Sequence, residues 1–356
     1  MNELDQFISL SKYAGERFDM IQAGGGNTSV KISDKKMIIK ASGCTLSSIN
    51  KNFGYVEVNQ KIILNMLSDD NFKKILIKKE REEKGSDIVK LSQKDKNKRA
   101  SIETTLHSLT YKYTLHTHPI AVNMICNQRE WKKVLERIFS QKDIMMVNYK
   151  TPGVDLALEI GKKILEKKNT PKIIFLQNHG LIIHSDNYQE VFQLNELVLS
   201  KLEKFLGLNF DRYKMTNFIS SEINQAFNSE LVSYLVEDSF LTTQLQKNKE
   251  LFFKYPFCPD SFVFCGESAL EISKNTVSKD IASYKNRFIE HPKVIIFDNL
   301  LFLLGADIPK IRMVEDVLKF NIMILKNNNK YVALKKDEIS YLSNWEAEAF
   351  RKNLKN

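Results

Sequence analysis

The sequence predicts an α/β protein, because short strand patterns alternate with helical patterns along most of the chain. Residues 172–176 form an apolar strand pattern, and residues 188–206 repeat apolar side chains at helical spacing. Two apolar runs, 294–297 and 300–304, flank the turn Asp298-Asn299 and predict a β-hairpin. Strands and helices that alternate in this way are typical of sheets covered by helices.

Composition limits the class of protein further. The chain has 356 residues, of which 43% are hydrophobic and 27% charged, so we expect two domains with a buried core. The excess positive charge behind the net charge of +10 is mostly lysine and is not focused in one patch, so a small anionic substrate fits this charge at least as well as nucleic acid does. No apolar run is long enough for a membrane span, and the N-terminus lacks the apolar segment of a signal peptide. The four cysteines form no C-x-x-C pair, so we expect a cytoplasmic protein without disulfides.

The first half of the chain begins with a predicted helix over residues 1–20 and a glycine-rich turn at 24–29. A hairpin is predicted over 30–39 and a second hairpin over 56–64, and the charged run 73–98 is interpreted as a solvated helix or loop. The remaining elements of this half are a helix at 102–111, a strand at 113–118 ended by Pro119, a strand at 144–147, a helix at 155–165, and a strand at 181–183 that pairs with 172–176 across Asn178-His179-Gly180.

A polar stretch at residues 207–226 predicts the domain boundary. We therefore expect one domain over 1–215 and a smaller α+β domain over 216–356. Besides the hairpin at 294–304, the second domain is predicted to contain a helix at 229–246, a strand at 261–264 and a helix at 309–324.

Three histidines are candidate metal ligands. His116 and His118 are two residues apart on a predicted strand, so their side chains point to the same face. His179 lies in a turn at the end of a buried strand, beside Gly180. Three neutral imidazoles leave a tetrahedral zinc ion one open position, which is the pattern of a catalytic metal. His116 and His118 taken alone are a weak signal, because two polar residues at a strand end give the same pattern.

Glu103 is the candidate proton carrier. It precedes His116 by thirteen residues and opens the predicted helix after Ser101. A carboxylate that is partly desolvated beside a metal can carry a proton, whereas a glutamate at a helix start can also simply complement the helix dipole. His107, one helical turn further on, is interpreted as a supporting or core residue.

A candidate anion pocket is formed by the glycine run Gly24-Gly25-Gly26-Asn27-Thr28-Ser29 together with Ser42-Gly43 and Ser101. Backbone N–H groups without Cβ obstruction can surround a phosphate. The run is neither a P-loop nor a dinucleotide-binding fingerprint. Each of these segments by itself is also consistent with an ordinary turn.

Five motifs occur in an order that resembles the class II aldolase/adducin family. They are Gly-Gly-Gly-Asn-Thr-Ser-Val-Lys (24–31), Lys-Ala-Ser-Gly (40–43), Ser-Ile-Glu-Thr (101–104), His-Thr-His-Pro (116–119) and Asn-His-Gly-Leu (178–181). The chain looks most like the aldolase part of fused rhamnulose-phosphate aldolase/alcohol dehydrogenase proteins. The resemblance covers about residues 10–206 and continues more weakly to Trp345-Glu346-Ala347-Glu348.

The resemblance implies a three-layer α/β/α fold with a central, mostly antiparallel sheet, followed by the smaller C-terminal α+β region. It implies a lyase that uses Zn²⁺ or another divalent metal to cleave or form a C–C bond in a ketose phosphate through a metal-stabilised enediolate. The family's ligands fall on His116, His118 and His179, and its acid/base on Glu103. Its phosphate-binding residues fall on Gly26, Asn27, Ser42, Gly43 and Ser101. Ile102 replaces a serine that some bacterial members carry.

The same scaffold also resembles sugar-phosphate epimerases, dehydratases and decarboxylases, and a non-enzymatic, adducin-like interaction module is a further alternative. The expected partners are a small sugar phosphate and further copies of the chain, as in a tetramer, with no nucleic acid and no membrane. No dinucleotide-binding domain follows, so no NAD chemistry is expected.

Overall fold

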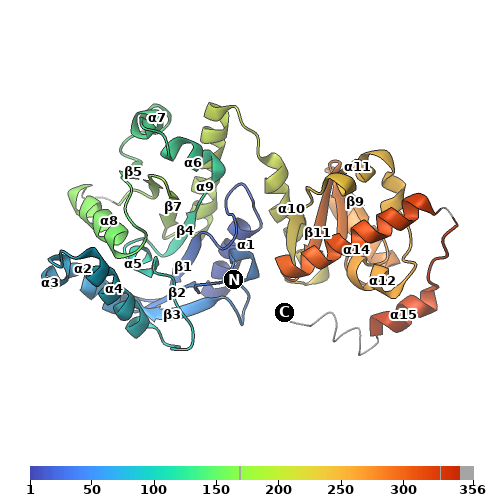
Figure 1. Ribbon diagram of the computed structural model, residues 1–356, viewed down its shortest axis with the longest axis horizontal. Helices are drawn as coiled ribbons and strands as arrows, with labels where there is room; N and C mark the ends of the chain where they lie inside the picture. Colours follow the sequence, from blue (N-terminus) through green and yellow to red (C-terminus); the bar gives the residue numbers. More distant parts are fainter. Residues whose placement is uncertain (168–169, 329, 345–356) are drawn as a thin grey trace. The chain divides into compact units, whose positions relative to one another are not determined.

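The computed structural model describes residues 1–167, 170–328 and 330–344. The chain divides into unit 1 (Met1–Phe210) and unit 2 (Asp211–Asn356), and the described residues of each unit are treated separately (Figure 1). Trp345-Glu346-Ala347-Glu348 lie outside the described residues. Within the described part of the chain, no helix is both long and apolar enough to cross a membrane.

Seven strands form one sheet in the described part of unit 1, in the order β3-β2-β1-β4-β7-β6-β5. All neighbouring strands run antiparallel except β5 and β6, so the predicted mostly antiparallel sheet is confirmed. The strands are β1 (Asn27–Lys31), β2 (Lys36–Lys40), β3 (Tyr55–Asn59), β4 (Tyr113–Thr117), β5 (Ile144–Val147), β6 (Ile173–Leu176) and β7 (Gly180–Ser185).

Helices cover both faces of this sheet, which gives the expected three layers. Alternate strand residues enter two separate cores: Leu115 and Ile183 pack in one, and Ile174 and Ile182 in the other. On the first face lie α1 (Glu3–Gly15), η1 (Leu46–Ser48), α6 (Ile120–Cys126), α7 (Trp131–Ile138) and α9 (Tyr188–Leu206). On the second face lie α2 (Gln60–Ser68), α3 (Asp70–Lys73), α4 (Lys78–Ser92), α5 (Thr104–His107) and α8 (Val154–Lys167).

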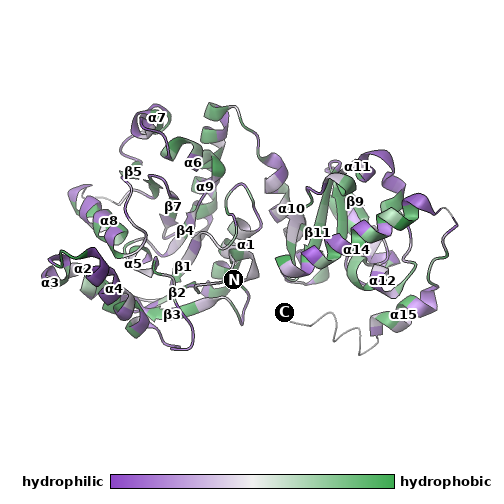
Figure 2. Ribbon diagram, in the orientation of Figure 1, coloured by the Kyte–Doolittle hydropathy of each residue, from purple (hydrophilic) through white to green (hydrophobic). Residues whose placement is uncertain are grey.

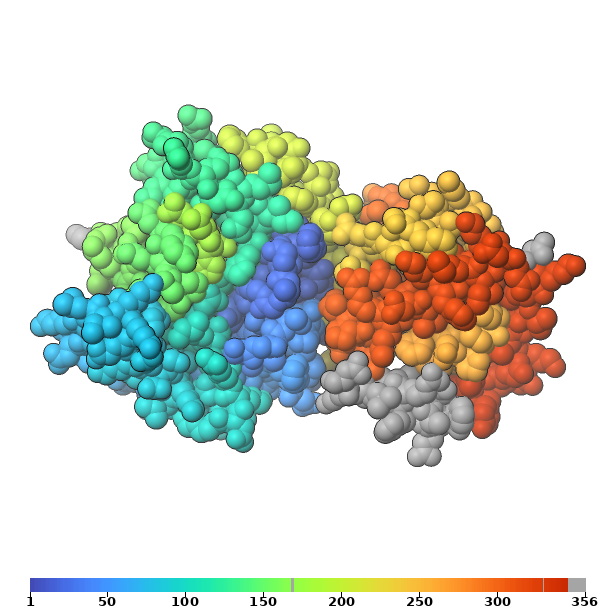
Figure 3. All heavy atoms as spheres, in the orientation of Figure 1, coloured from blue at the N-terminus to red at the C-terminus, as the bar shows by residue number. Residues whose placement is uncertain are grey.

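The charged run 73–98 contains α4, a helix with most side chains exposed, as the interpretation of a solvated helix predicts. Figure 2 colours much of α4 hydrophilic, and Figure 3 shows the light-blue residues of this region at the surface of unit 1.

A four-stranded sheet, ordered β8-β11-β10-β9, organises the described part of unit 2. Its strands are β8 (Val232–Leu235), β9 (Leu270–Ile272), β10 (Val294–Phe297) and β11 (Leu300–Gly305). The hairpin of β10 and β11 turns at Asp298 and Asn299, both with positive φ, as predicted. The helices are α10 (Asp211–Phe227), α11 (Ser239–Lys247), η2 (Lys249–Phe253), α12 (Pro259–Cys265), α13 (Val277–Arg287), α14 (Ile308–Asn327) and α15 (Lys336–Asn344).

Several sequence-based expectations are wrong. The predicted hairpin at 56–64 is strand β3 followed by helix α2, because the Asn59 side chain accepts a hydrogen bond from Lys61 N and caps the helix. The predicted strand at 261–264 is helix α12, which Pro259 starts in its first turn. The predicted helix at 229–246 is strand β8 followed by helix α11, which Asp238 caps.

Further differences concern residues 102–111 and 207–226. The predicted helix at 102–111 shortens to the single turn α5, and the polar stretch at 207–226 is largely the helix α10. The predicted domain boundary at 215/216 lies inside α10, whereas the units divide at the start of that helix.

Candidate metal centre and active site

The three candidate histidines meet at one end of the unit 1 sheet. His116 is on β4, and His118 follows just beyond the end of that strand. His179 lies in the turn that joins β6 to β7. Because β4 pairs with β7, with Thr117 opposite Leu181, this turn is carried to the end of β4.

Their ring nitrogens converge on a single point. His116 Nε2 is 3.2 Å from His179 Nε2 and 3.3 Å from His118 Nε2. The candidate ligand atoms of the three residues all lie within 4.8 Å of one another. His116 Nδ1 is 3.0 Å from the carbonyl oxygen of Leu181, which assigns the proton to Nδ1 and leaves the lone pair on Nε2.

This donor set fits a divalent cation. Imidazole nitrogens that face one another at these distances without an intervening acceptor repel unless they share a proton or a metal ion. Three imidazoles are a common ligand set for catalytic zinc. His116 and its carbonyl partner also supply the hydrogen bond that typically orients a metal-binding histidine.

Glu103 lies beside this cluster, immediately before α5. Its Oε1 is 3.2 Å from His116 Nε2 and 3.3 Å from His179 Nε2, and its Oε2 accepts a hydrogen bond from Asn27 Nδ2 at 3.3 Å. Burial raises the pKa of Glu103, but His116 and His179 lower it more, so that the net pKa lies well below the usual value. The carboxylate is therefore ionised at neutral pH.

The histidines are held in different electrostatic surroundings. Burial, together with the neighbouring His116 and His179, lowers the pKa of His118 to about 3, so its ring is neutral at neutral pH. Burial also lowers the pKa of His116, but the adjacent Glu103 carboxylate raises it more, and the net shift is upward.

Two glycines give the rings the space that they occupy. A Cβ on Gly180 would lie 2.2 Å from the carbonyl oxygen of Thr117 and 3.0 Å from His118 Cδ2. A Cβ on Gly25 would lie 2.9 Å from His118 Nδ1. Any larger residue at either position would displace the backbone or the ring of a candidate ligand.

Of the candidate anion-binding residues, Asn27 and Ser101 contact Glu103, whereas Ser42 and Gly43 are exposed. Asn27 contacts Glu103, and Ser101 Oγ accepts a hydrogen bond from Glu103 N at 3.3 Å. Ser42 N donates to the carbonyl oxygen of Arg99 at 2.7 Å, next to the bridge between Ala41 and Ala100, so the Ser42 and Ser101 segments lie side by side. Gly26 and Gly43 have positive φ angles of 69° and 83°. The Ser42 side chain and Gly43 are exposed.

Lys40 is a residue of this site that the sequence interpretation missed. It is only 5% exposed, its Nζ donates to the carbonyl oxygen of Gly24 at 3.0 Å, and it lies near enough to Glu103 to interact electrostatically. The available signal was its place in the Lys-Ala-Ser-Gly motif, directly after the apolar residues Met37-Ile38-Ile39, since a buried lysine is almost always paired with another group.

His107 does not belong to the three-histidine cluster. It is fully buried, with Nδ1 2.7 Å from Ser29 Oγ, and burial lowers its pKa to about 3.

Comparison with known proteins gives a family match that lies within unit 1. The family model described as Class II Aldolase and Adducin N-terminal domain matches residues 6–203. A solved N-terminal class II aldolase domain from Thermoplasma acidophilum is 26% identical, with a TM-score of 0.50 over 58% of this chain and 94% of that chain. A solved L-fuculose-1-phosphate aldolase from Thermus thermophilus is 13% identical, with a TM-score of 0.36 over 58% of this chain and 94% of that chain.

A curated relative, the uncharacterized oxidoreductase YuxG of Bacillus subtilis (strain 168), is 25% identical over 223 residues. These cover 60% of this chain, but the chain spans only 31% of the length of that relative.

Proposed function

Because the chain belongs to the class II aldolase and adducin family, we propose that it is a zinc-dependent lyase that cleaves or forms a C–C bond in a ketose phosphate. In this proposal unit 1 is the catalytic domain, His116, His118 and His179 hold the metal, and Glu103 is the acid/base. Family membership supports the reaction class, and the arrangement of these four side chains supports their roles.

The observation that carries the proposal is the position of Glu103. One carboxylate oxygen lies 3.2 Å and 3.3 Å from two candidate ligand atoms, while Asn27 holds the other oxygen. An acid/base needs such a fixed position beside the polarised substrate.

The chemistry then follows from these residues. Bound zinc supplies a Lewis acid that polarises a substrate carbonyl. The ionised Glu103 carboxylate accepts the proton from the carbon next to that carbonyl in the synthetic direction, and returns it there after cleavage. The hydrogen bond from Asn27 keeps the Glu103 carboxylate facing the histidines, so that the carboxylate is in place for proton transfer in both directions of the reaction.

We propose that the anionic end of the substrate binds to the surrounding loops. Gly26, Asn27, Ser42, Gly43 and Ser101 supply backbone N–H groups and polar side chains. The Lys40 ammonium adds positive charge between the glycine run and Glu103. A phosphate gains charge-assisted hydrogen bonds from such a set.

The test is a panel of ketose phosphates incubated with the purified, zinc-loaded full chain. We expect release of an aldehyde and a three-carbon ketone phosphate, abolished by a chelator and restored by added zinc. Epimerised, dehydrated or decarboxylated product without aldehyde would replace the aldolase with one of the related reactions. No turnover and no stoichiometric metal would favour an adducin-like interaction module.

A further inference from the structure

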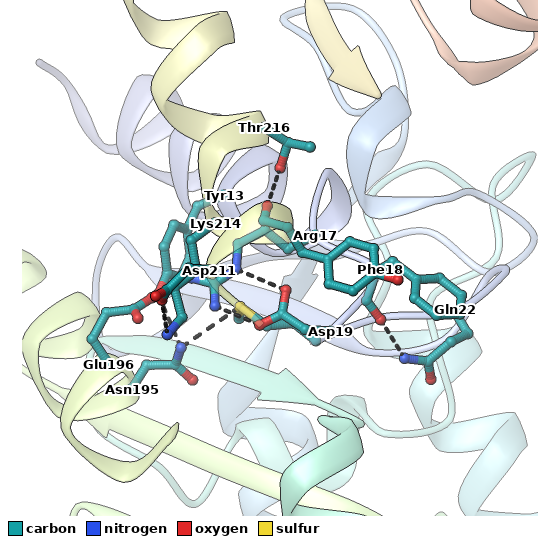
Figure 4. A network of polar contacts seen from close by, with 12 residues as sticks. Tyr13, Arg17, Phe18, Asp19, Gln22, Asn195, Glu196, Asp211, Lys214 and Thr216 are labelled. Carbon is teal, nitrogen blue, oxygen red and sulfur yellow. Dashed lines mark hydrogen bonds and ion pairs between the residues drawn. The ribbon is translucent and has the colours of Figure 1, made fainter. Parts of the chain in front are cut away.

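The loop between α1 and β1 contains a buried ion pair that the proposed chemistry does not use. Arg17 and Asp19 are each 2% exposed. Arg17 Nε donates to Asp19 Oδ1 at 3.1 Å, and Nη2 donates to Asp19 Oδ2 at 2.6 Å, so that both ends of the carboxylate are held (Figure 4). Burying two charges is costly, and an apolar pair of similar size is often as stable.

This pair also contacts α9, the last helix of unit 1 in the sequence. Arg17 Nη1 donates to Glu196 Oε1 on α9 and lies 3.4 Å from the hydroxyl of Tyr13, which also donates to Glu196. Asn195 Nδ2 donates to the Tyr13 hydroxyl at 2.9 Å. Figure 4 shows these side chains gathered around the guanidinium. The loop is therefore fixed to both α1 and α9.

The same loop holds the backbone on both sides of a candidate metal ligand. His118 N donates to the carbonyl oxygen of Met20 at 3.0 Å, and Ile120 N donates to that of Asp19 at 2.9 Å. Met20 N in turn donates to the carbonyl oxygen of Arg17 at 3.0 Å. Asp19 is the shared residue, since its side chain binds Arg17 and its carbonyl oxygen binds the segment that follows His118.

His118 needs this support more than the other two ligands do. His116 lies within β4, between two hydrogen-bonded strands, and His179 is in a tight turn between β6 and β7. His118 lies beyond the end of β4, before Pro119, which has no N–H to donate. The loop over residues 17–25 supplies its backbone partner, Met20, and, at Gly25, the surface against which its ring packs.

We propose that the buried Arg17–Asp19 pair is a positioning device that holds His118 in place to bind the metal ion. This inference rests on the metal centre of the proposed function. It assigns Arg17 and Asp19 as positioning residues, which act through the loop backbone and touch neither metal nor substrate.

The experiment measures Co²⁺ binding to the full chain, by competition with a chelator and by the intensity of the visible Co²⁺ absorption bands. The test variant is Arg17→Met/Asp19→Asn. The matched control is Arg81→Met/Asp155→Asn, which removes another partly buried pair of unit 1: Arg81 Nε and Nη2 both donate to Asp155 Oδ1, at 3.0 and 2.5 Å, between α4 and α8. Urea unfolding of the metal-free proteins measures how much each variant loses in stability.

We expect the Arg17/Asp19 variant to bind Co²⁺ about ten- to a hundredfold more weakly, with altered absorption bands, because residues that orient a ligand typically contribute that much to metal affinity. The Arg81/Asp155 control should retain the wild-type affinity even if its unfolding midpoint falls by the same amount. If the double variant does not fold, Asp19→Asn alone takes its place with the same expectation.

Wild-type Co²⁺ affinity in the folded Arg17/Asp19 variant, or an equal loss in the control, would overturn the positioning role while leaving the metal centre intact. A wild-type protein that binds no Co²⁺ would instead overturn the metal centre, and the positioning role with it. The two failures are therefore distinct.

Discussion

Asn27 lies directly opposite His116 in the antiparallel register of β1 and β4. Directly opposed residues point to the same face of a sheet, so the Asn27 amide and the His116 ring approach Glu103 together. Asn27 donates to Oε2, and His116 Nε2 is 3.2 Å from Oε1. The register of β1 and β4 thus places Asn27 beside His116, and both side chains contact the Glu103 carboxylate.

Replacing Glu103 with Gln should separate catalysis from metal binding. The amide preserves the shape and an oxygen for Asn27, but it cannot accept the proton, so we expect kcat to fall by roughly 10²–10⁴. Zinc content, measured by metal analysis of the purified protein, should stay near the wild-type value. A variant with full metal and full turnover would rule out Glu103 as the base.

Replacing His179 with Ala should weaken zinc binding and lower activity together, because it removes one of the three candidate imidazole ligands. His291→Gln, in unit 2, is the matched control and should keep both. Zinc per chain and turnover are measured on the same preparations. Retention of wild-type zinc by His179→Ala would show that the ion is held elsewhere.

Replacing Gly180 with Ala should weaken metal binding and lower stability. The new Cβ would lie 2.2 Å from the carbonyl oxygen of Thr117, so β7 must move away from the strand that carries His116. Gly24→Ala is the control, because nothing lies within 4 Å of its Cβ position. We expect a loss of about 1–3 kcal/mol in the free energy of unfolding for Gly180→Ala alone. Equal effects of the two substitutions in urea unfolding would contradict this account.

Replacing Lys40 with Met should raise KM for a phosphorylated substrate more than it lowers kcat. A charge-assisted hydrogen bond contributes about 1.5–3 kcal/mol, which corresponds to roughly a ten- to hundredfold rise in KM. Lys98→Met is the control, since Lys98 lies over the ring of Tyr55. The comparison uses steady-state kinetics with phosphorylated and unphosphorylated forms of the same sugar. A similar rise in KM for both forms would remove the role in phosphate binding.

The metal-free protein should lose stability between pH 6.5 and pH 3. Burial lowers the pKa values of His107 and His184 to about 3, whereas in the unfolded chain histidine titrates near 6.5. Between these values the unfolded state binds more protons, so stability falls as pH falls, by about 1.4 kcal/mol per pH unit for each histidine. Above pH 6.5 both states are neutral and this dependence disappears.

Urea unfolding at pH 5 and pH 7 checks this expectation. Tyr111 N donates to His184 Nδ1. Among the described residues, Lys31 and Lys172 lower the pKa of His184 further, and Asp186 raises it. His184→Asn should reduce the difference in stability between the two pH values. An unchanged difference would show that other groups cause it.

Local patterns were sufficient for much of unit 1. The β6–β7 hairpin and the β1–β2 hairpin were predicted, because alternation and turn residues are properties of neighbouring residues. The three histidines and Glu103 were named as candidates from their residue types and motifs, and their roles remain predictions. Short apolar runs were the main failure: residues 261–264 fit a strand or a buried helix equally well by periodicity, and Pro259 in the first turn of α12, together with the packing of this helix, favours the helix.

The sequence by itself determined the donor types, their order and the family, since these depend on residue identity and on short-range spacing. Only the tertiary structure decided that β1, β4 and β7 bring Asn27, His116 and His179 to one end of a sheet, that Lys40 is buried there, and that Arg17 and Asp19 support His118. These relationships join segments that are far apart in the chain. Strand pairing and burial bring these segments together, and both depend on the packing of the whole unit and not on neighbouring residues alone.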